Sequence, residues 1–430
     1  MKMKRFLVLV LAAVMVTFSL SACDSSESSN DGAKTGTNEK NVEPKTIKLE
    51  FLQQKGEEAP QTAYAQIIER FREENKNIVI EQNTIPDPGN VLISRIAAND
   101  APPIFTDYPT QMQFKQKVKN GYIECLTGHD FLNRVNQGVL EMSKANDGKN
   151  YALPLSQNYM CIYYNMDMFN EMSIDIPVTW AELMSACQKF EQAGIQPFLL
   201  SYKDLWCLGH IFQSLAISMN DGLVEYTVDV IEGEKKVADS AGYKALAEKI
   251  LEITDYGNED ALGMSANQMW DLFANGQSAM IISGSYARGT ILMANPDMNL
   301  GAFPIPNDEQ DKTAVLTGVD AAICISGDAT PEEKEAGLKF IEFISRVENA
   351  QLWSDTDGAP SCIKGTVYKN KGVLPVIDKI NEGPIHDWMA SSVQNNISND
   401  LFTSVQAMII ERDIEAFLEN VDKTIGNALQ

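Results

Sequence analysis

Short apolar strands and amphipathic helices alternate along this chain, and the alternation limits its fold more than any other feature. Residues 46–53 alternate apolar and polar positions, which is typical of a strand. Residues 64–71 then repeat apolar side chains at the spacing of one helix face. Further strands are expected at 78–80 and 104–105, with a helix around 92–96 between them. This order predicts parallel strands joined by crossover helices, and hence an α/β sheet.

The same alternation returns in the second half of the chain. Residues 159–164 indicate a strand, and residues 179–193 indicate a helix that begins with a capping box of Thr179 and Glu182. Further elements are expected as strands at 278–283 and 321–326, as a capped helix from Thr330, and as mostly helical structure after about residue 366. The sequence therefore predicts a second α/β unit.

The first 23 residues read as a targeting signal. Basic residues precede an apolar run of 15 residues, Phe6 to Leu20, which is short for a membrane-spanning helix. The run ends in Leu-Ser-Ala-Cys at residues 20–23, which resembles a bacterial lipobox in which Cys23 receives the lipid. An ordinary signal peptide with a coincidental cysteine is the alternative. Residues 24–45 contain almost no apolar side chains and predict a flexible tether.

Composition excludes several classes of partner. The chain carries 35 Lys and Arg against 59 Asp and Glu, a net charge of −24. Because affinity for phosphate backbones comes mainly from basic residues, we expect no nucleic-acid partner. The same charge argues against a polybasic membrane contact. Only three histidines are present, so we expect no histidine-based metal centre and no cofactor.

Catalytic motifs are missing or stand in the wrong context. Ser361 and Lys364 fit the S-x-x-K pattern, but the only Lys-Thr-Gly lies upstream, at residues 34–36. The chain contains neither a phosphate-binding G-x-x-x-x-G-K-[ST] loop nor a zinc-binding H-E-x-x-H. The six cysteines after Cys23 show no C-x-x-C spacing, and we expect mostly free thiols. We therefore expect a protein that is not an enzyme.

Five segments carry a family resemblance. They are residues 149–154 (KNYALP), 163–169 (YYNMDMF), 177–183 (PVTWAEL), 273–284 (FANGQSAMIISG) and 358–360 (GAP). In this order they resemble motifs of the bacterial extracellular solute-binding proteins of ABC importers, specifically the sugar-binding family 1 typified by maltose-binding protein. Pro103, Gln277 and Tyr286 depart from residues common in that family, which alters the local surface without threatening the fold.

The resemblance implies an α/β, two-lobe periplasmic-binding-protein fold of type II-like topology. Each lobe would be a sheet flanked by helices, with a ligand cleft between the lobes. The N-lobe would comprise residues 46–153 plus 305–352, and the C-lobe residues 154–304 plus 353–430. Crossings between the lobes are expected near residues 153–156 and at residues 303–306, where two prolines favour an extended chain.

A sugar calls for flat aromatic faces and for side chains that pair with hydroxyl groups. In doubly wound sheets the ligand lies beyond the carboxyl ends of strands, so loops after strands supply candidates. The candidate ligand-binding residues are Gln53, Gln54, Asp107, Tyr108, Asn158, Tyr159, Trp206, Ser285, Tyr286, Arg288, Asp320, Trp353, Asp357 and Trp388. Helix-core packing is the alternative for Trp206, and a neighbouring carboxylate is the alternative partner for Arg288.

The leading hypothesis is a monomeric, lipid-anchored solute-binding protein that captures a mono- or oligosaccharide and delivers it to the permease subunits of an ABC importer. It would lie on the outer face of the cell membrane of a Gram-positive bacterium. The alternatives are the same fold binding a polyamine, a glycerol phosphodiester or a peptide, a lipid-anchored enzyme, and an adhesive lipoprotein.

Overall fold

The computed structural model describes residues 45–219, 222–383 and 385–428, which belong to one compact unit. The predicted signal peptide, its Cys23 and residues 24–44 of the predicted tether lie outside the described residues. No helix within the described part of the chain combines the length and the apolar character that crossing a bilayer requires.

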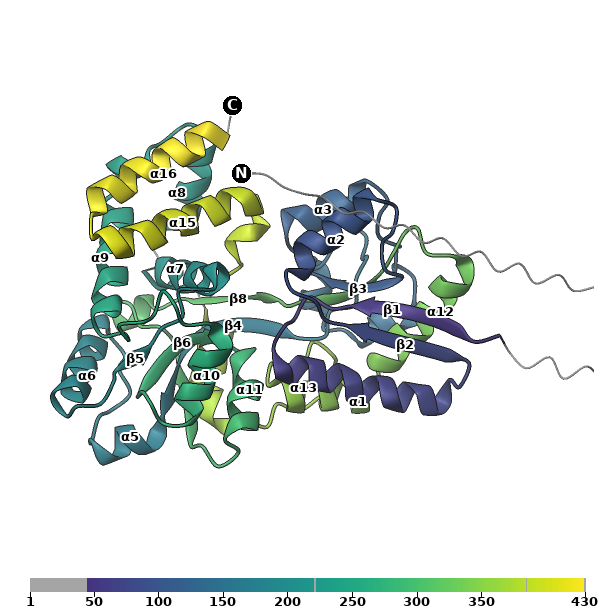
Figure 1. Ribbon diagram of the computed structural model, residues 1–430, viewed down its shortest axis with the longest axis horizontal. Coiled ribbons are helices and arrows are strands. Elements are labelled where there is room, and N and C mark those ends of the chain that lie inside the picture. The colour runs from purple at the N-terminus through teal and green to yellow at the C-terminus, as the bar shows by residue number, and fades with distance from the viewer. Residues whose placement is uncertain (1–44, 220–221, 384, 429–430) are drawn as a thin grey trace, which may run out of the picture. The chain divides into compact units, whose positions relative to one another are not determined.

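A four-stranded sheet forms the first lobe, which we call the N-lobe (Figure 1). Its order is β2 (Ile78–Asn83), β1 (Ile47–Leu52), β3 (Ile104–Asp107) and β9 (Ala322–Ile325). β1 pairs in parallel with β2 and β3, whereas β9 runs antiparallel to β3. The predicted parallel strands are thus confirmed, and their crossover helices are α1 (Glu58–Glu74) and α2 (Pro88–Ala97).

Alternate residues of β1 enter two cores on opposite faces of the N-lobe sheet. Phe51 packs with Tyr64 of α1 and with Phe340 of α12 (Pro331–Ile344). Leu52 belongs instead to a smaller core that contains Phe105 and Phe114. The other N-lobe helices are α3 (Met112–Lys119), α4 (Gln137–Met142) and α13 (Val347–Asp357). Both faces of the sheet are therefore covered, as its mainly parallel strands require.

A six-stranded sheet forms the second lobe, the C-lobe. Its path runs β10 (Ile385–His386), β8 (Val315–Val319), β4 (Gln157–Asn165), β6 (Met280–Gly284) and β5 (Phe198–Leu199), and β7 (Leu300–Phe303) also pairs with β4. The long β4 pairs antiparallel with β6, β7 and β8. Figure 1 shows β4 and β8 side by side, leading from the C-lobe toward the N-lobe.

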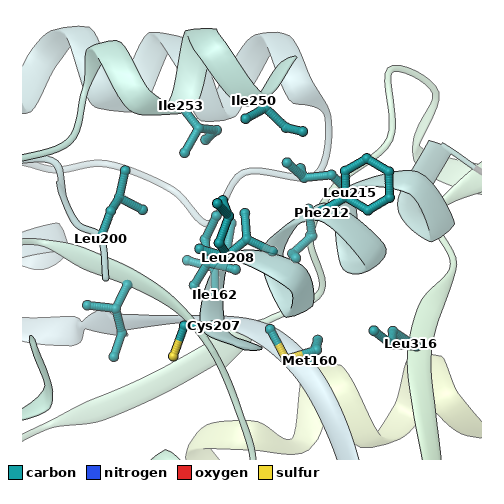
Figure 2. Packing of buried hydrophobic residues seen from close by; sticks show 14 of the residues in the cluster. Met160, Ile162, Leu200, Cys207, Leu208, Phe212, Leu215, Ile250, Ile253 and Leu316 are labelled. Atoms are coloured by element: carbon teal, nitrogen blue, oxygen red, sulfur yellow. The ribbon is translucent and has the colours of Figure 1, made fainter. Parts of the chain in front are cut away.

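Helices cover the C-lobe sheet and close one large core. Figure 2 shows part of this core, in which Leu208, Phe212 and Leu215 of one helix pack between the sheet and a second helix that carries Ile250 and Ile253. The helices are α5 (Met166–Glu171), α6 (Trp180–Gln192), α7 (Leu205–Met219), α8 (Leu223–Ile231), α9 (Ala241–Asp255), α10 (Ala266–Ala274), α11 (Ala287–Ala294), α14 (Leu374–Glu382), α15 (Asn395–Glu411) and α16 (Ile414–Ala428). The capping boxes predicted at Thr179 and Thr330 are both formed.

Three segments carry the chain between the lobes. Residues 153–158 and 317–323 run together, because Leu153 bridges to Ile323 and β4 pairs with β8. The third crossing follows Ile363, which is buried in the N-lobe core and bridges to Val135, and it ends before Tyr368, which packs against the C-lobe core.

The crossing predicted at residues 303–306 is wrong. β7 pairs with β4 inside the C-lobe, and Ile305 is buried in the C-lobe core. The extended chain that Pro304 and Pro306 favour thus stays within one lobe. Trp353, which was assigned to the C-lobe, packs in the N-lobe core. Apart from these corrections, the residue limits of the lobes remain a prediction.

Candidate functional site

A cavity of about 580 Å³ is lined by residues of both lobes. The N-lobe contributes residues 54–57, 85–88, 108, 110 and 111, which lie within five positions after the ends of β1, β2 and β3. The C-lobe contributes residues of α7, α10 and α15 together with Tyr286 and Trp388. The site therefore lies beyond the carboxyl ends of the N-lobe's parallel strands, where α/β folds place ligands. Its volume lies within the usual range of small-molecule pockets.

Aromatic rings form the C-lobe wall of the cavity. Trp206 of α7 is 40% exposed, and its ring lies 5.7 Å from that of Tyr286 and 6.5 Å from that of Trp270. His210, one helical turn further along α7, lies 5.2 Å from Trp206 and 4.5 Å from Trp388. The neighbouring rings thus fix the orientation of Trp206 while leaving part of its surface free. Such a ring can stack on the apolar C–H face of a sugar.

Two glycines let these rings approach the C-lobe sheet closely. A Cβ atom on Gly284, at the end of β6, would collide with the ring of Tyr286. A Cβ atom on Gly318 of β8 would collide with Asp387 and with the indole of Trp388. The absence of a side chain at these two glycines therefore makes room for the rings of Tyr286 and Trp388 at the cavity.

A buried ionic cluster forms the floor of the cavity. The ammonium group of Lys55 donates to Asp320 at 2.6 Å and to Asp357 at 3.2 Å, and all three side chains are almost fully buried. Ser156 also donates to Asp320, at 3.3 Å. Burial alone would lower the pKa of Lys55, but the charges of Asp320 and Asp357 raise it well above its usual range. Lys55 is thus held in its charged form and fixes Asp320 at the cavity.

Glu57 lies at the N-cap of α1 and lines the cavity, but it does not cap the helix with its side chain. Its carboxylate accepts from the backbone N–H of Glu57 itself, and no other described residue forms a hydrogen bond or ion pair with it. Burial raises the pKa of Glu57 to about 7, although the charge of Lys55 opposes this shift. A partly buried carboxylate without a partner on another residue is free to accept hydrogen bonds from a solute.

His210 is held neutral. Burial lowers its pKa to about 4, and the charge of Asp320 offsets only part of this effect. Its Nδ1 atom lies 2.9 Å from the hydroxyl group of Tyr286. The imidazole therefore serves as a neutral part of the aromatic wall and a hydrogen-bond partner of Tyr286.

The structure brings half of the candidate residues to the cavity. Those that line it are Gln54, Tyr108, Asn158, Trp206, Tyr286, Asp320 and Trp388. Gln54, Tyr108 and Asp320 come just after strands, as the sequence argument expected, whereas Asn158 lies near the start of β4 and Trp206 lies on α7. Their role in binding remains a prediction.

The other seven candidates do not line the cavity, and several of them support residues that do. Ser285 donates to the side chain of Asn158 at 2.9 Å, and Asp357 accepts from Lys55. Trp353 is 1% exposed because it packs on Tyr64 in the N-lobe core. The remaining four are also engaged elsewhere: Gln53 with Thr84, Asp107 with Lys117, Tyr159 with Tyr368, and Arg288 against Gly358.

Sequence reasoning missed several lining residues. Lys55 and Glu57 come directly after the predicted first strand, so the rule that selected Gln54 also points to them. His210 stands four positions after Trp206 and shares its helix face. Residues 395, 398, 399 and 402 of α15 also lie on one helix face, but the sequence offers no signal that this helix reaches the cavity.

Two lobes joined by three crossing segments, with an aromatic and hydrogen-bonding cleft between them, define the class of two-lobe solute-binding proteins. Comparison with known proteins gives the family. The chain belongs to the bacterial extracellular solute-binding proteins, since the model of that family matches residues 66–371.

Individual relatives match over most of the chain. The multiple sugar-binding protein of Streptococcus mutans is 26% identical over 382 residues, which cover 87% of this chain and 89% of that one. The melibiose/raffinose/stachyose-binding protein MelE of Bacillus subtilis is 22% identical over 374 residues, covering 84% and 81%. Among solved structures, RafE in complex with raffinose superposes with a TM-score of 0.81 at 23% identity, covering 90% of this chain and 100% of that one. These relatives are binding proteins.

Proposed function

We propose that this chain is the sugar-binding component of a bacterial ABC importer and that it captures a neutral oligosaccharide in the interlobe cleft. The observation that carries the proposal is the pairing of the supported, part-exposed ring of Trp206 with carboxylate and amide side chains from the opposite lobe. Aromatic faces accommodate the C–H surfaces of sugars, and these polar groups accept their hydroxyl protons. The names of the two curated relatives support the same solute class.

The charge of the cleft argues against an anionic solute such as a glycerol phosphodiester. A phosphate site needs convergent basic side chains. Among the described lining residues, Lys55 is the only lysine, no arginine is present, and Lys55 is committed to two carboxylates. The acidic and aromatic lining does suit a polyamine, which is therefore the second candidate.

We further propose that lipid on Cys23 holds the protein at the outer face of the cell membrane, as a monomer, with residues 24–45 as a tether. The lipobox and the polar composition of the following segment support this arrangement. For the lobes we propose limits at the three crossing segments, residues 153–158, 317–323 and 364–368, and the packing on either side of each segment supports them.

A thermal-shift screen tests the proposed solute. Raffinose, stachyose, maltotriose, spermidine and glycerol 3-phosphate are compared at equal concentration, because a solute that binds only the folded state raises the melting temperature. We expect stabilisation by at least one of the three sugars. Stabilisation by spermidine alone would favour the second candidate, and stabilisation by glycerol 3-phosphate alone would contradict both.

A further inference from the structure

We propose that the cleft selects its solute by charge, with Glu57 as the residue that rejects acidic sugars. The inference rests on the proposed function and adds the class of sugar that the site takes. Neutral and amine-bearing sugars would bind, whereas sugars that carry a uronate or phosphate group would be excluded.

The ionisable groups around the cavity are mostly acidic. Glu57, Asp87, Asp204 and Asp320 all line it, and Lys55 is the only basic residue with a permanent charge among the described lining residues. The ammonium group of Lys55 lies between Asp320 at 2.6 Å and Asp357 at 3.2 Å. Because two carboxylates share the ammonium group of Lys55, this cluster offers no free positive group to a solute.

Glu57 differs from the other acidic residues in having no partner on another residue. Asp204 accepts a hydrogen bond from the backbone of Ala266 at 2.8 Å, and Asp87 accepts one from Asn90 at 2.9 Å at an exposed position. Among the described residues the carboxylate of Glu57 has no such contact with another residue and accepts only from its own backbone N–H, although it is only partly exposed. Its charge is therefore available to a solute.

The position of Glu57 lets its charge act across the whole cleft. Besides burial, the charges of Asp320 and Glu57 raise the pKa of Tyr108, which belongs to the N-lobe. Burial raises the pKa of Tyr286 in the C-lobe, and the charge of Glu57 adds to that shift as well. Glu57 and Tyr286 line the same cavity from opposite lobes, so the carboxylate of Glu57 faces a solute bound between the lobes.

The negative charge of Glu57 affects acidic, neutral and basic groups of a solute differently. A carboxylate on the solute would be repelled by Glu57 more strongly than in bulk water, because the effective dielectric constant is lower at a partly buried site. A hydroxyl group donates to Glu57 without this penalty. A protonated amine is attracted to Glu57 and to the faces of the tryptophans.

The test uses three versions of one sugar that differ at a single carbon. Raffinose is compared with raffinose whose galactose C6 is oxidised to a carboxylate and with its 6-amino-6-deoxy derivative. Maltotriose and maltotriose oxidised at C6 of its non-reducing unit form a second matched pair. Dissociation constants are measured by tryptophan fluorescence with the purified protein at pH 8, above the pKa of about 7 of Glu57.

Glu57→Gln removes the charge but keeps the size and hydrogen-bonding capacity of the side chain. Glu58→Gln is the matched control, because it makes the same change of charge one residue further on, at an exposed position outside the cavity lining. We expect the carboxylate form to bind the wild type about tenfold or more weakly than its neutral parent. In Glu57→Gln this ratio should fall to about threefold or less, and in Glu58→Gln it should be unchanged.

Equal binding of the neutral and carboxylate sugars by the wild type would overturn the inference. The same holds if Glu57→Gln keeps the wild-type ratio, since the discrimination would then come from another residue. If neither raffinose nor maltotriose binds, the proposed function fails and the inference fails with it. These outcomes are distinguishable, because in the first two cases a neutral sugar still binds.

Discussion

Lys55 joins parts of the chain that meet at the floor of the cleft. It follows β1, and its two partners are Asp320 in the second crossing segment and Asp357 at the end of α13. Buried charges of this kind are tolerated only when they are paired, and loss of one partner leaves the others uncompensated. The cluster therefore stabilises the junction of the lobes as well as the position of Asp320.

Replacing Lys55 by Met tests this role at the level of stability. The substitution leaves Asp320 and Asp357 buried without their cation, and we expect the free energy of unfolding to fall by about 3–5 kcal/mol. Denaturant unfolding at pH 7 measures the change. Lys48→Met is the matched control, since Lys48 pairs with Glu81 on the surface and should cost less than about 1 kcal/mol. Equal effects of the two variants would contradict the role of the cluster.

His210 makes the free energy of unfolding depend on pH, so that the protein becomes less stable as the pH falls. Its pKa is about 4 in the folded protein and 6.5 in the unfolded chain, so the unfolded state binds more protons between these values. The free energy of unfolding keeps its full value from this group above pH 6.5, and it falls as the pH drops toward 4, because the unfolded chain then binds the proton that buried His210 does not. We expect His210→Gln to reduce the loss of stability between pH 7 and pH 5 by about 2 kcal/mol. Denaturant unfolding of both proteins at the two pH values measures this, and parallel pH profiles would argue against a buried neutral histidine.

At the scale of elements, the start of α15 bridges the two lobes. The side-chain amide of Asn395 donates to Gln113 at 3.2 Å and to Gln111 at 3.4 Å. Asn395 begins a helix of the C-lobe, whereas both glutamines lie at the start of α3 in the N-lobe. Since Asn395 and Gln111 also line the cavity, the bridge closes one side of the cleft.

Removing the bridge should make release of the solute faster. A hydrogen bond of this type contributes about 0.5–1.5 kcal/mol, so we expect Asn395→Ala to raise the dissociation rate about two- to tenfold with little change in melting temperature. Stopped-flow tryptophan fluorescence with the best-binding sugar measures the rate. Gln394→Ala is the control, because the side chain of this neighbouring residue is exposed and makes no capping hydrogen bond to α15. A similar rate for both variants would show that the bridge does not slow release of the solute.

Several elements were predictable because each carries a local signal. Strand alternation at β1, one-face periodicity at α1 and the capping boxes of α6 and α12 all depend on neighbours in sequence. The failed crossing at residues 303–306 shows the limit of such signals. Its prolines favour an extended chain, but whether that chain changes lobe depends on pairing with β4, which is remote in sequence.

At the scale of the whole molecule, the cleft combines loops of the N-lobe with helices of the C-lobe. The strand-end rule found Gln54, Tyr108 and Asp320, because it depends on local order of elements. The strand-end rule could not tell which tryptophan reaches the cavity. Trp388 lines the cavity and Trp353 fills the N-lobe core, but both lie near helices in the sequence. The contribution of α15 depends on packing between distant segments and has no local signal.

The central claim is that this protein binds a neutral oligosaccharide between its lobes, against the ring of Trp206. Isothermal titration calorimetry of raffinose, stachyose and maltotriose with the wild type and with Trp206→Ala tests it most directly. The account predicts a dissociation constant on the order of 1 μM for at least one sugar, and a loss of about tenfold or more in Trp206→Ala, whose melting temperature should stay close to that of the wild type. Absence of binding by every sugar, or equal binding by both proteins, would contradict it.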